Sequence, residues 1–476
     1  MSQLSINTNV PSVVSQFNLQ RNSDKLNNTL ESISTGLRIR SAKDGPADLI
    51  SGETLRLELT SINSAIQNNQ RANNFAATAE ASLREIGSLL DEIEGILVNS
   101  ANEGVLSQEE LEANQASVDQ AVLSINRIAS STRFANRSVL DGSFGFELSG
   151  VNRFDQAGTL SDVNVRLANF NSSGDAISVD VNLTATASQA TVTLNNGGTA
   201  SVDSTIEIIG NSGAVTLNIG AGQSVDDAVN AFTDATGVSS SNGILTSVEF
   251  GSNAFVNVNN VVGALLTNSE ASAVGTNVEG TINGQEFEGD GLRATLATTN
   301  LQLELSFQES VTTTGDVGSF SIESGGALFQ LGAEINLAQQ VNIGLESFLA
   351  SSLGSVSVDE DGNALNRTLS SIVTGGENSI LAGSASIAQD IVAESQRQVT
   401  TTQGFLGSIQ RNTIETNLNS LSVAFENITA ARSTIVDVNF AQATAELTQQ
   451  QILLQANVST AAIANSNPQT LLQLLG

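Results

Sequence analysis

The hydrophobic residues near both ends of the chain recur in alternating steps of three and four, the spacing of a heptad. Four runs share this rhythm: Leu26, Leu30, Ile33 and Leu37; Leu55, Leu59, Ile62 and Ile66; Leu83, Ile86, Leu90, Ile93 and Leu97; and Ile414, Leu418, Leu421, Phe425 and Ile428. The spacing predicts long helices, each with an apolar stripe that one helix cannot bury alone. We therefore expect these helices to pack on one another or on another molecule.

Proline positions predict where the N-terminal helices begin. Pro11 suits the opening turn of a first helix, which the pattern carries to about residue 39. Residues 41–46 break that helix, and the proline at the end of the break opens a second helix over about residues 47–101. Ser107 followed by acidic residues has the character of an N-cap, so a third helix is predicted to about residue 130.

The helical pattern returns near residue 384. One long helix is predicted to about residue 436, weakened by Gly404 and Gly407. A last helix is predicted over about residues 440–465, with Pro468 stopping it. The simplest arrangement folds the chain back on itself, so that the N- and C-terminal helices lie side by side and both termini meet at one end.

The middle of the chain, about residues 144–353, has a different pattern. It is rich in Gly, Asn, Ser, Thr and Val, and its hydrophobic residues alternate at 177–183, as in a strand. Strands are also predicted at 215–219 and 246–250, on either side of a helix at about 224–234. The predicted fold class is therefore mainly α at both termini, as a coiled-coil bundle of long antiparallel helices, with a β-rich α+β insert that projects outward.

Composition excludes several classes of function. The chain has 476 residues, a formal charge of −31 and neither Cys nor His. Such an acidic chain repels nucleic acids and anionic membrane surfaces. Without Cys and His there is no thiolate catalysis, no Ser-His-Asp triad and none of the usual structural zinc sites. We expect no enzyme activity, no cofactor and no metal site, and no hydrophobic stretch is long enough to insert into a membrane. The N-terminus also lacks the pattern of a cleaved signal peptide.

Three segments with weak motifs favour simple structural explanations. Residues 220–224 follow a predicted strand like a dinucleotide loop, but Val225 stands where a third glycine is needed. The acidic runs at 359–363 and 286–290 lack the spacing of a calcium loop. We interpret all three as surface turns.

Several motifs at both ends resemble those of bacterial flagellins. The resemblance rests on residues 33–44 (ISTGLRIRSAKD), 73–86 (NNFAATAEASLREI), 428–435 (ITAARSTI), 449–456 (QQQILLQA) and 467–475 (NPQTLLQLL). These motifs occur in the family's order, and the match covers about residues 1–145 and 326–476.

The resemblance implies a subunit of an extracellular flagellar filament, a helical homo-oligomer. It implies inner-tube helices at 1–42 and 435–476, an outer-tube domain formed by 43–165 and 326–434, and a variable β-rich surface insert at 166–325. It also implies export through the flagellar secretion apparatus without a cleaved signal. A chaperone at the C-terminal helix, a filament cap and hook-associated proteins are the implied partners.

Two sets of candidate residues follow from the pattern and the resemblance together. The polymerisation interface is predicted to contain Leu26, Leu30, Ile33, Leu37, Leu447, Ile452, Leu454 and Val458. In many flagellins a Toll-like receptor reads a basic residue on the second helix, whereas this chain has Glu92 and Glu94 in that segment and Ser117 in place of a family Glu. Such a charge reversal predicts weak or absent receptor activation.

Three other functions are weighed against the filament subunit. A hook–filament junction protein shares the helical ends but caps the filament instead of extending it. An adhesin would use the β-rich insert and remains compatible with a filament. A hydrolase inside the insert would require the zinc-binding histidines that this chain lacks.

Overall fold

The computed structural model describes residues 9–101, 106–150, 160–170, 174–358 and 364–475. The chain divides into two compact units, which are treated separately. Unit 1 contains Met1–Gln67 and Leu418–Gly476, and unit 2 contains Asn68–Asn417. Among the described residues, none of the helices combines the length and apolar character needed to cross a bilayer.

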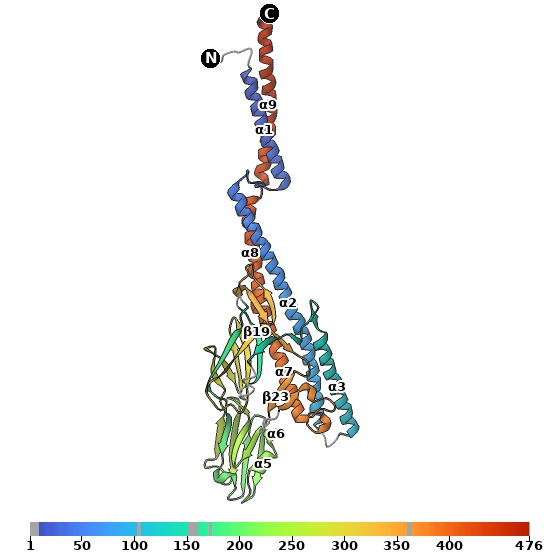
Figure 1. Ribbon diagram of the computed structural model, residues 1–476, viewed down its shortest axis with the longest axis vertical. Helices are drawn as coiled ribbons and strands as arrows, with labels where there is room; N and C mark the ends of the chain where they lie inside the picture. The colour runs from blue at the N-terminus through green and yellow to red at the C-terminus, as the bar shows by residue number, and fades with distance from the viewer. Residues whose placement is uncertain (1–8, 102–105, 151–159, 171–173, 359–363, 476) are drawn as a thin grey trace. The chain divides into compact units, whose positions relative to one another are not determined.

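Unit 1 is built from long helices. It contains α1 (Val10–Thr35), the first part of α2 (Pro46–Ser100), most of α8 (Thr416–Val436) and α9 (Phe440–Leu475). α1 and α9 lie antiparallel along each other (Figure 1), and side-chain hydrogen bonds join Ser12 to Asn465 at 2.5 Å and Thr29 to Gln450 at 3.1 Å. The prediction that the N- and C-terminal helices lie side by side is therefore confirmed.

α1 begins as predicted but ends early. The Asn9 side chain caps the first turn by accepting a hydrogen bond from Ser12 N, and Pro11 lies in that turn. The helix was predicted to reach about residue 39, but it stops at Thr35 because Gly36 adopts a left-handed conformation with φ 73°. Leu37, predicted as a helical seam position, lies beyond the helix and forms a β-bridge with Asp437.

α9 continues past the predicted stop at Pro468. Proline has no N–H, so the carbonyl four residues earlier, that of Ala464, loses its helical partner. In this chain the Asn9 Nδ2 group donates to Ala464 O at 2.8 Å and supplies the missing hydrogen bond. The prediction of an end at about residue 465 is therefore wrong, because it did not include this contact from the start of α1.

The long C-terminal helix predicted over 384–436 is formed in three parts. α7 (Ala385–Ser408) is followed by the π-helix η5 (Ile409–Glu415) and then by α8. Gly404 and Gly407 lie in the last turns of α7, directly before the π-helix. A π-segment widens a helix locally without ending it, so the prediction of a continuous but weakened helix holds.

Unit 2 contains a helical core built on α2, α3 and α7. α3 (Gln108–Ser131) opens with a capping box in which Ser107 and Glu110 bond each other's backbone N–H, close to the predicted start. The α2 seam residues Leu83, Ile86, Leu90, Ile93 and Leu97 are all buried in this core. Their apolar stripe is thus buried within the subunit. The bounds of α2 also match the prediction.

The β-rich part of unit 2 consists of small antiparallel sheets. The five-stranded sheet has the order β15 (Gln285–Glu286), β14 (Glu279–Ile282), β6 (Ile177–Ala185), β19 (Gly315–Gly325), β4 (Phe146–Ser149). The six-stranded sheet has the order β16 (Glu288–Asp290), β17 (Arg293–Ala297), β18 (Leu301–Phe307), β5 (Leu160–Ala168), β21 (Gln340–Ile343), β20 (Ala327–Gln330). Buried residues of both sheets share one hydrophobic core.

A second β core lies between two smaller sheets. These have the orders β13 (Glu270–Val274), β12 (Phe255–Val262), β8 (Ser204–Ile209), β9 (Ala214–Ile219), and β10 (Val238–Ser241), β11 (Ile244–Phe250), β7 (Gln189–Thr193). The remaining strands form pairs: β1 (Arg133–Phe134) with β2 (Arg137–Ser138), β3 (Asp141–Phe144) with β22 (Leu345–Ser347), and β23 (Gly354–Val358) with β24 (Ala364–Thr368). Short 3₁₀ turns occur at η1 (Asn195–Gly198), η2 (Leu337–Gln339), η3 (Leu369–Ser371) and η4 (Ile380–Ala382).

The three predicted strands of the insert match β6, β9 and β11, whereas the predicted helix at 224–234 is divided. It forms two short pieces, α5 (Asp226–Asn230) and α6 (Thr233–Thr236). Asp226 accepts hydrogen bonds from Ser240 Oγ and Gly243 N, which ties the helix start to the β10–β11 turn. Tertiary contacts of this kind override the local helix pattern.

Candidate functional site

The contact between α1 and α9 is a narrow seam with few large hydrophobic residues. On α1 the seam positions recur in steps of three and four and are buried or half-buried: Ser12, Ser15, Leu19, Asn22, Leu26, Thr29 and Ile33. The facing positions on α9 have the same spacing: Ala443, Leu447, Gln450, Leu454, Asn457, Ala461 and Ala464. Because most of these side chains are small or polar, the seam buries little apolar surface.

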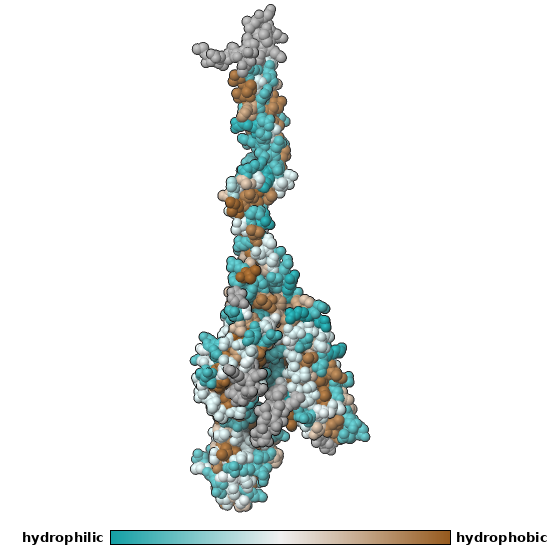
Figure 2. Space-filling view, viewed as in Figure 1, coloured by the Kyte–Doolittle hydropathy of each residue, from teal (hydrophilic) through white to brown (hydrophobic). Residues whose placement is uncertain are grey.

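Large hydrophobic side chains instead lie on the exposed sides of the two helices. We call them the exposed apolar set: Val10, Val13, Val14, Phe17 and Leu30 of α1, and Phe440, Ile452, Leu453, Val458 and Ile463 of α9. Phe17 is 68% exposed and Ile463 is 62% exposed. Figure 2 shows hydrophobic residues on the surface of this helix pair. Single exposed hydrophobic residues are ordinary, but a series along both helices of one pair indicates an interaction surface.

The structure divides the predicted interface residues into two groups. Leu26, Ile33, Leu447 and Leu454 are half-buried at seam positions, whereas Leu30, Ile452 and Val458 belong to the exposed apolar set. The predicted run placed Leu30 on the seam, but Thr29 occupies that position and bonds Gln450. Leu37 lies outside the helix. Contact of any of these residues with a neighbouring subunit stays a prediction.

Sequence reasoning missed part of the exposed apolar set. Val10, Val13, Val14, Phe17, Phe440, Leu453 and Ile463 were not among the predicted interface residues. A signal for them existed, because Val10, Val13, Val14 and Phe17 repeat at helical spacing on a second face of α1. The heptad run from Leu26 to Leu37 does not include that face, because the run begins after Phe17.

The turn between α1 and α2 is held by charged groups. Asp44 Oδ2 accepts hydrogen bonds from Arg40 N, Ser41 N and Ser41 Oγ. The hydrogen bond from the Arg40 backbone, helped by those from Ser41, keeps the pKa of Asp44 below its ordinary value. Arg38 also reaches Asp48 at 3.2 Å. These contacts fix the turn of the ISTGLRIRSAKD motif.

The three positions that differ from the receptor-binding pattern lie on α2 and α3. Glu92 and Ser117 are exposed, while Glu94 is half-buried and accepts a hydrogen bond from Gln389 at 2.7 Å. The negative charge of Glu92 is therefore available at the surface. Weak receptor activation stays a prediction.

The hydrogen bonds of residues 220–224 exclude a dinucleotide-binding loop in this segment. Gly220 N donates to Gln223 Oε1 at 3.0 Å, and Ala221 N donates to Asp203 Oδ1 at 2.9 Å. Backbone N–H groups that are engaged in this way are not free to bind a phosphate.

The described carboxylates form no metal site. Within the described ranges, no three acidic side chains come together as metal ligands would. The run 359–363 lies outside the described residues. The other acidic run, interpreted as a surface turn, lies instead in strands β15 and β16, with Glu286 and Glu288 exposed.

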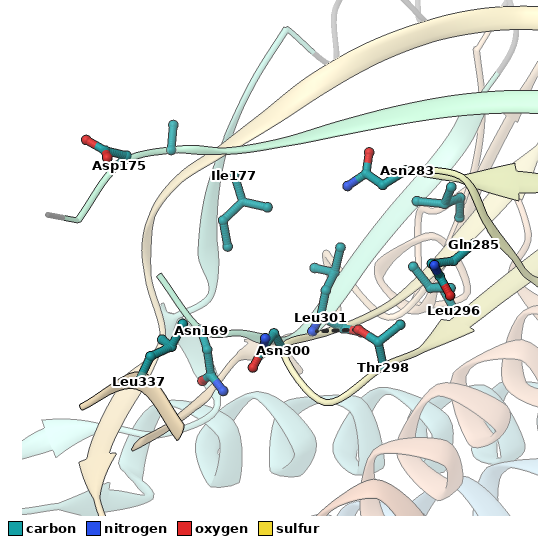
Figure 3. A pocket seen from close by; sticks show the side chains of 12 residues that line it. Asn169, Asp175, Ile177, Asn283, Gln285, Leu296, Thr298, Asn300, Leu301 and Leu337 are labelled. Atoms are coloured by element: carbon teal, nitrogen blue, oxygen red, sulfur yellow. Dashed lines mark hydrogen bonds between the residues drawn. The ribbon is translucent and has the colours of Figure 1, made fainter. Parts of the chain in front are cut away.

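One pocket of about 290 Å³ lies between the ends of β6, β14, β17 and β18 (Figure 3). Its floor includes Ile282, Leu296 and Leu301. The Asn283 amide at its rim donates to Ser178 O and accepts from Asp180 N, so its polar atoms are engaged in holding the strands. The pocket is thus the open end of the β-sheet core, and it brings together no catalytic set.

Comparisons with known proteins agree with the resemblance at both ends. The profile of the bacterial flagellin N-terminal helical region matches residues 6–145, and that of the C-terminal helical region matches residues 389–475. A flagellin of Salmonella typhimurium is 28% identical over an alignment of 516 residues, which covers 99% of each chain.

Other relatives have a higher identity over a shorter part of the chain. B-type flagellin of Pseudomonas aeruginosa is 37% identical over 142 residues, which is 30% of this chain and 29% of the relative. Polar flagellin F of Vibrio parahaemolyticus is 34% identical over 142 residues, which is 30% of this chain and 37% of the relative. The chain therefore aligns with about a third of the length of these relatives.

Among solved structures, a flagellar junction protein of Legionella pneumophila is 13% identical, with 78% of this chain and 99% of that chain covered. Its TM-score of 0.24 is too low to support a conclusion about fold or function. The two matching helical regions and the end-to-end similarity to the Salmonella protein show that this chain resembles bacterial flagellins at both ends.

Proposed function

We propose that this chain is a flagellin, the structural subunit of an extracellular bacterial flagellar filament, and that it polymerises through α1 and α9. The observation that carries the proposal is the exposed apolar set on both helices of one narrow pair. Burying those side chains against other copies would remove apolar surface from water at about 25 cal/mol per Å². Neighbouring subunits are the proposed partner, because every copy of the chain presents the same exposed apolar set.

The weak seam explains why assembly would be needed to order unit 1. Among its described residues, only a few hydrophobic side chains are buried: Ile39, Ile62, Ala65, Val436, Ala443 and Ala464. The helix pair gains little from its own packing to offset the entropy of ordering a chain. Contacts with neighbours would provide the missing stabilisation, so ordering and polymerisation would occur together.

From the same argument we infer that different segments of the chain would form different layers of the filament. Residues 1–42 and 435–476 would form the inner tube, and residues 43–165 with 326–434 would form the outer tube. Residues 166–325 would face outward as a surface insert. The buried α2 seam from Leu83 to Leu97 supports an outer-tube domain with a core of its own.

Export and capping partners belong to the same proposal. Before assembly, α9 exposes Ile452, Leu453, Val458 and Ile463. A chaperone that covers this helix would prevent premature association, and a filament cap would guide each subunit after export. Hook-associated proteins would join the filament to its base.

Seeded growth tests the proposal. Purified protein is incubated with flagellar seeds and inspected by electron microscopy, with limited proteolysis of the monomer beside it. We expect long filaments, and we expect proteases to cut unit 1 of the monomer before unit 2. Seeds that stop after a short cap of added protein would instead identify a junction protein, and seeds that do not change would refute both functions.

A further inference from the structure

A group of paired charges joins α7 to the six-stranded sheet inside unit 2. Arg397 of α7 bonds Glu304 of β18 at 2.8 Å and Glu394 of its own helix at 2.7 Å. Arg293 of β17 also reaches Glu394 at 2.7 Å, and Arg166 of β5 pairs with Glu304. These ion pairs link one helix to three neighbouring strands.

Glu346 of β22 lies beside this group without an ion pair of its own among the described contacts. Its Oε1 atom is buried and has no hydrogen-bond partner. The charged groups that face it are Asp162 and Arg166 from β5, Glu304 from β18 and Arg397 from α7. On the paired strand β3, Asp141 is opposite Ser347 and not opposite Glu346.

One carboxyl group of this set must hold a proton for the charges to balance. Burial raises the pKa of Asp162 as well as that of Glu346, but Asp162 accepts a hydrogen bond from Val163 N that opposes the shift. Glu346 Oε1 has no such partner, so Glu346 is the group that holds the proton. The three arginines face four carboxyl groups, those of Glu304, Glu394, Asp162 and Glu346. When Glu346 is ionised, the group has one negative charge in excess. When Glu346 is protonated, positive and negative charges are equal, and its carboxyl group gains a hydrogen-bond donor.

The surroundings favour the protonated form of Glu346 in the folded chain. Burial raises its pKa to about 8, and Asp162 and Glu304 add to this effect, while Arg166 and Arg397 oppose it. Glu304 behaves in the opposite way: burial alone would raise its pKa, but Arg397 and Arg166 outweigh burial and lower it. The two glutamates therefore ionise in different pH ranges.

We propose that protonation of Glu346 controls how tightly α7 packs against β17 and β18, the strands that its ion pairs reach, so that alkaline conditions loosen this contact. Protonated Glu346 leaves the ion pairs of Arg397 balanced. Ionised Glu346 adds an unpaired negative charge next to Glu304 and Asp162, and relief of that repulsion favours an opened state in which water reaches the carboxylate. The inference concerns the packing of unit 2 and does not depend on filament assembly.

The direction of the pH effect follows from proton linkage. A carboxyl group exposed in the opened state titrates near 4.5, whereas in the packed state it titrates near 8. Between these values the packed state holds one proton more, so opening becomes about tenfold easier per pH unit. Above about pH 8 both states are ionised and the effect levels off.

Hydrogen exchange of the full-length monomer tests this inference. Amide protection in α7 is measured from pH 5 to pH 9.5, corrected for intrinsic exchange, with α3 as the internal reference. We expect α7 protection to fall relative to α3 up to about pH 8 and then to level off. Equal pH dependence of the two helices in the wild-type protein would overturn the proposal, even if no variant could be studied.

Glu346→Gln is the decisive variant, because it keeps the shape and removes the titration. Its α7 protection should vary little with pH and should exceed that of the wild type at pH 8. Glu323→Gln, at an exposed position of β19, is the matched control and should behave like the wild type. A Glu346→Gln protein with the wild-type pH profile would contradict the proposal.

Discussion

Asn9 serves two helices at once. Its side-chain oxygen accepts a hydrogen bond from Ser12 N at 3.1 Å and so caps α1. Its amide nitrogen donates to Ala464 O at 2.8 Å and replaces the hydrogen bond that Pro468 cannot make. The start of α1 and the continuation of α9 past Pro468 therefore depend on one residue. Neither heptad pattern nor proline rules reveal such a link, because it joins positions 455 residues apart.

Asn9→Asp separates the two roles. Aspartate keeps the capping oxygen but loses the N–H donor, so α1 should begin as before while the end of α9 frays. The loss of one hydrogen bond is worth about 1 kcal/mol, or roughly a fivefold drop in amide protection after Ala464, measured in assembled filaments, in which unit 1 is ordered. Asn9→Ala is the comparison and should weaken both helices. Equal protection of the α9 end in the wild type and both variants would refute this role.

At the scale of elements, Gly36 is the residue that ends α1. Its φ of 73° is easy for glycine and unfavourable for other residues, and a Cβ there would meet no atom within 4 Å. Gly36→Ala should therefore lower stability by about 1 kcal/mol through backbone strain alone. Chemical denaturation followed by circular dichroism measures the change.

Gly95→Ala is the matched control for that prediction. Gly95 lies in the helical interior of α2, has no positive φ, and a Cβ there also meets no atom within 4 Å. The same substitution should raise stability by about 0.5–1 kcal/mol in this setting. If both variants shifted stability in the same direction, the left-handed cap would not be the cause.

The sequence predicts the elements well where local signals dominate. The starts of α1, α2 and α3 follow from Pro11, Pro46 and Ser107, and alternation identifies β6. It fails where contacts outside the local pattern decide. Pro468 is accommodated by Asn9, and Asn230 bonds Ser240 of β10 at the point where a predicted helix is divided. Periodicity also left the register of α1 open by one residue, since Thr29 and not Leu30 faces α9.

The candidate site is less predictable than the fold for a related reason. Leu26, Leu30 and Ile33 share one heptad pattern, but the pattern does not say which residues pack within the chain and which stay exposed. That distinction appears only when α1 and α9 are placed together. Phe17 and Ile463 are then seen to be exposed, although neither belongs to a heptad run.

For the whole molecule, charge is distributed very unevenly between the two units. Unit 1 has seven basic and nine acidic residues, a formal charge of −2, whereas unit 2 has eleven basic and forty acidic residues, a formal charge of −29. The surface proposed for assembly is thus nearly neutral. Assembly would also bring copies of unit 2 from neighbouring subunits together, and these strongly acidic copies repel one another.

Filament growth should therefore depend on salt. The screening length falls from about 30 Å at 0.01 M to about 10 Å at 0.1 M ionic strength, which weakens repulsion between neighbouring copies of unit 2. We expect the monomer concentration left at the end of seeded growth to fall at least about threefold over this range. Sedimentation of the filaments measures it. A residual monomer concentration that rises with salt would show that repulsion between units does not limit growth.

The most direct test of the assembly surface is the elongation rate of seeds with α9 variants. Ile452→Asp with Val458→Asp places charges on exposed apolar residues, and Gln451→Asp with Gln455→Asp places the same charges on exposed polar neighbours. Circular dichroism of each monomer should match the wild type, because neither pair lies on the α1–α9 seam. We predict that the first variant adds no length to the seeds while the second elongates them. Normal elongation by Ile452→Asp with Val458→Asp would contradict the claim that the exposed apolar set drives polymerisation.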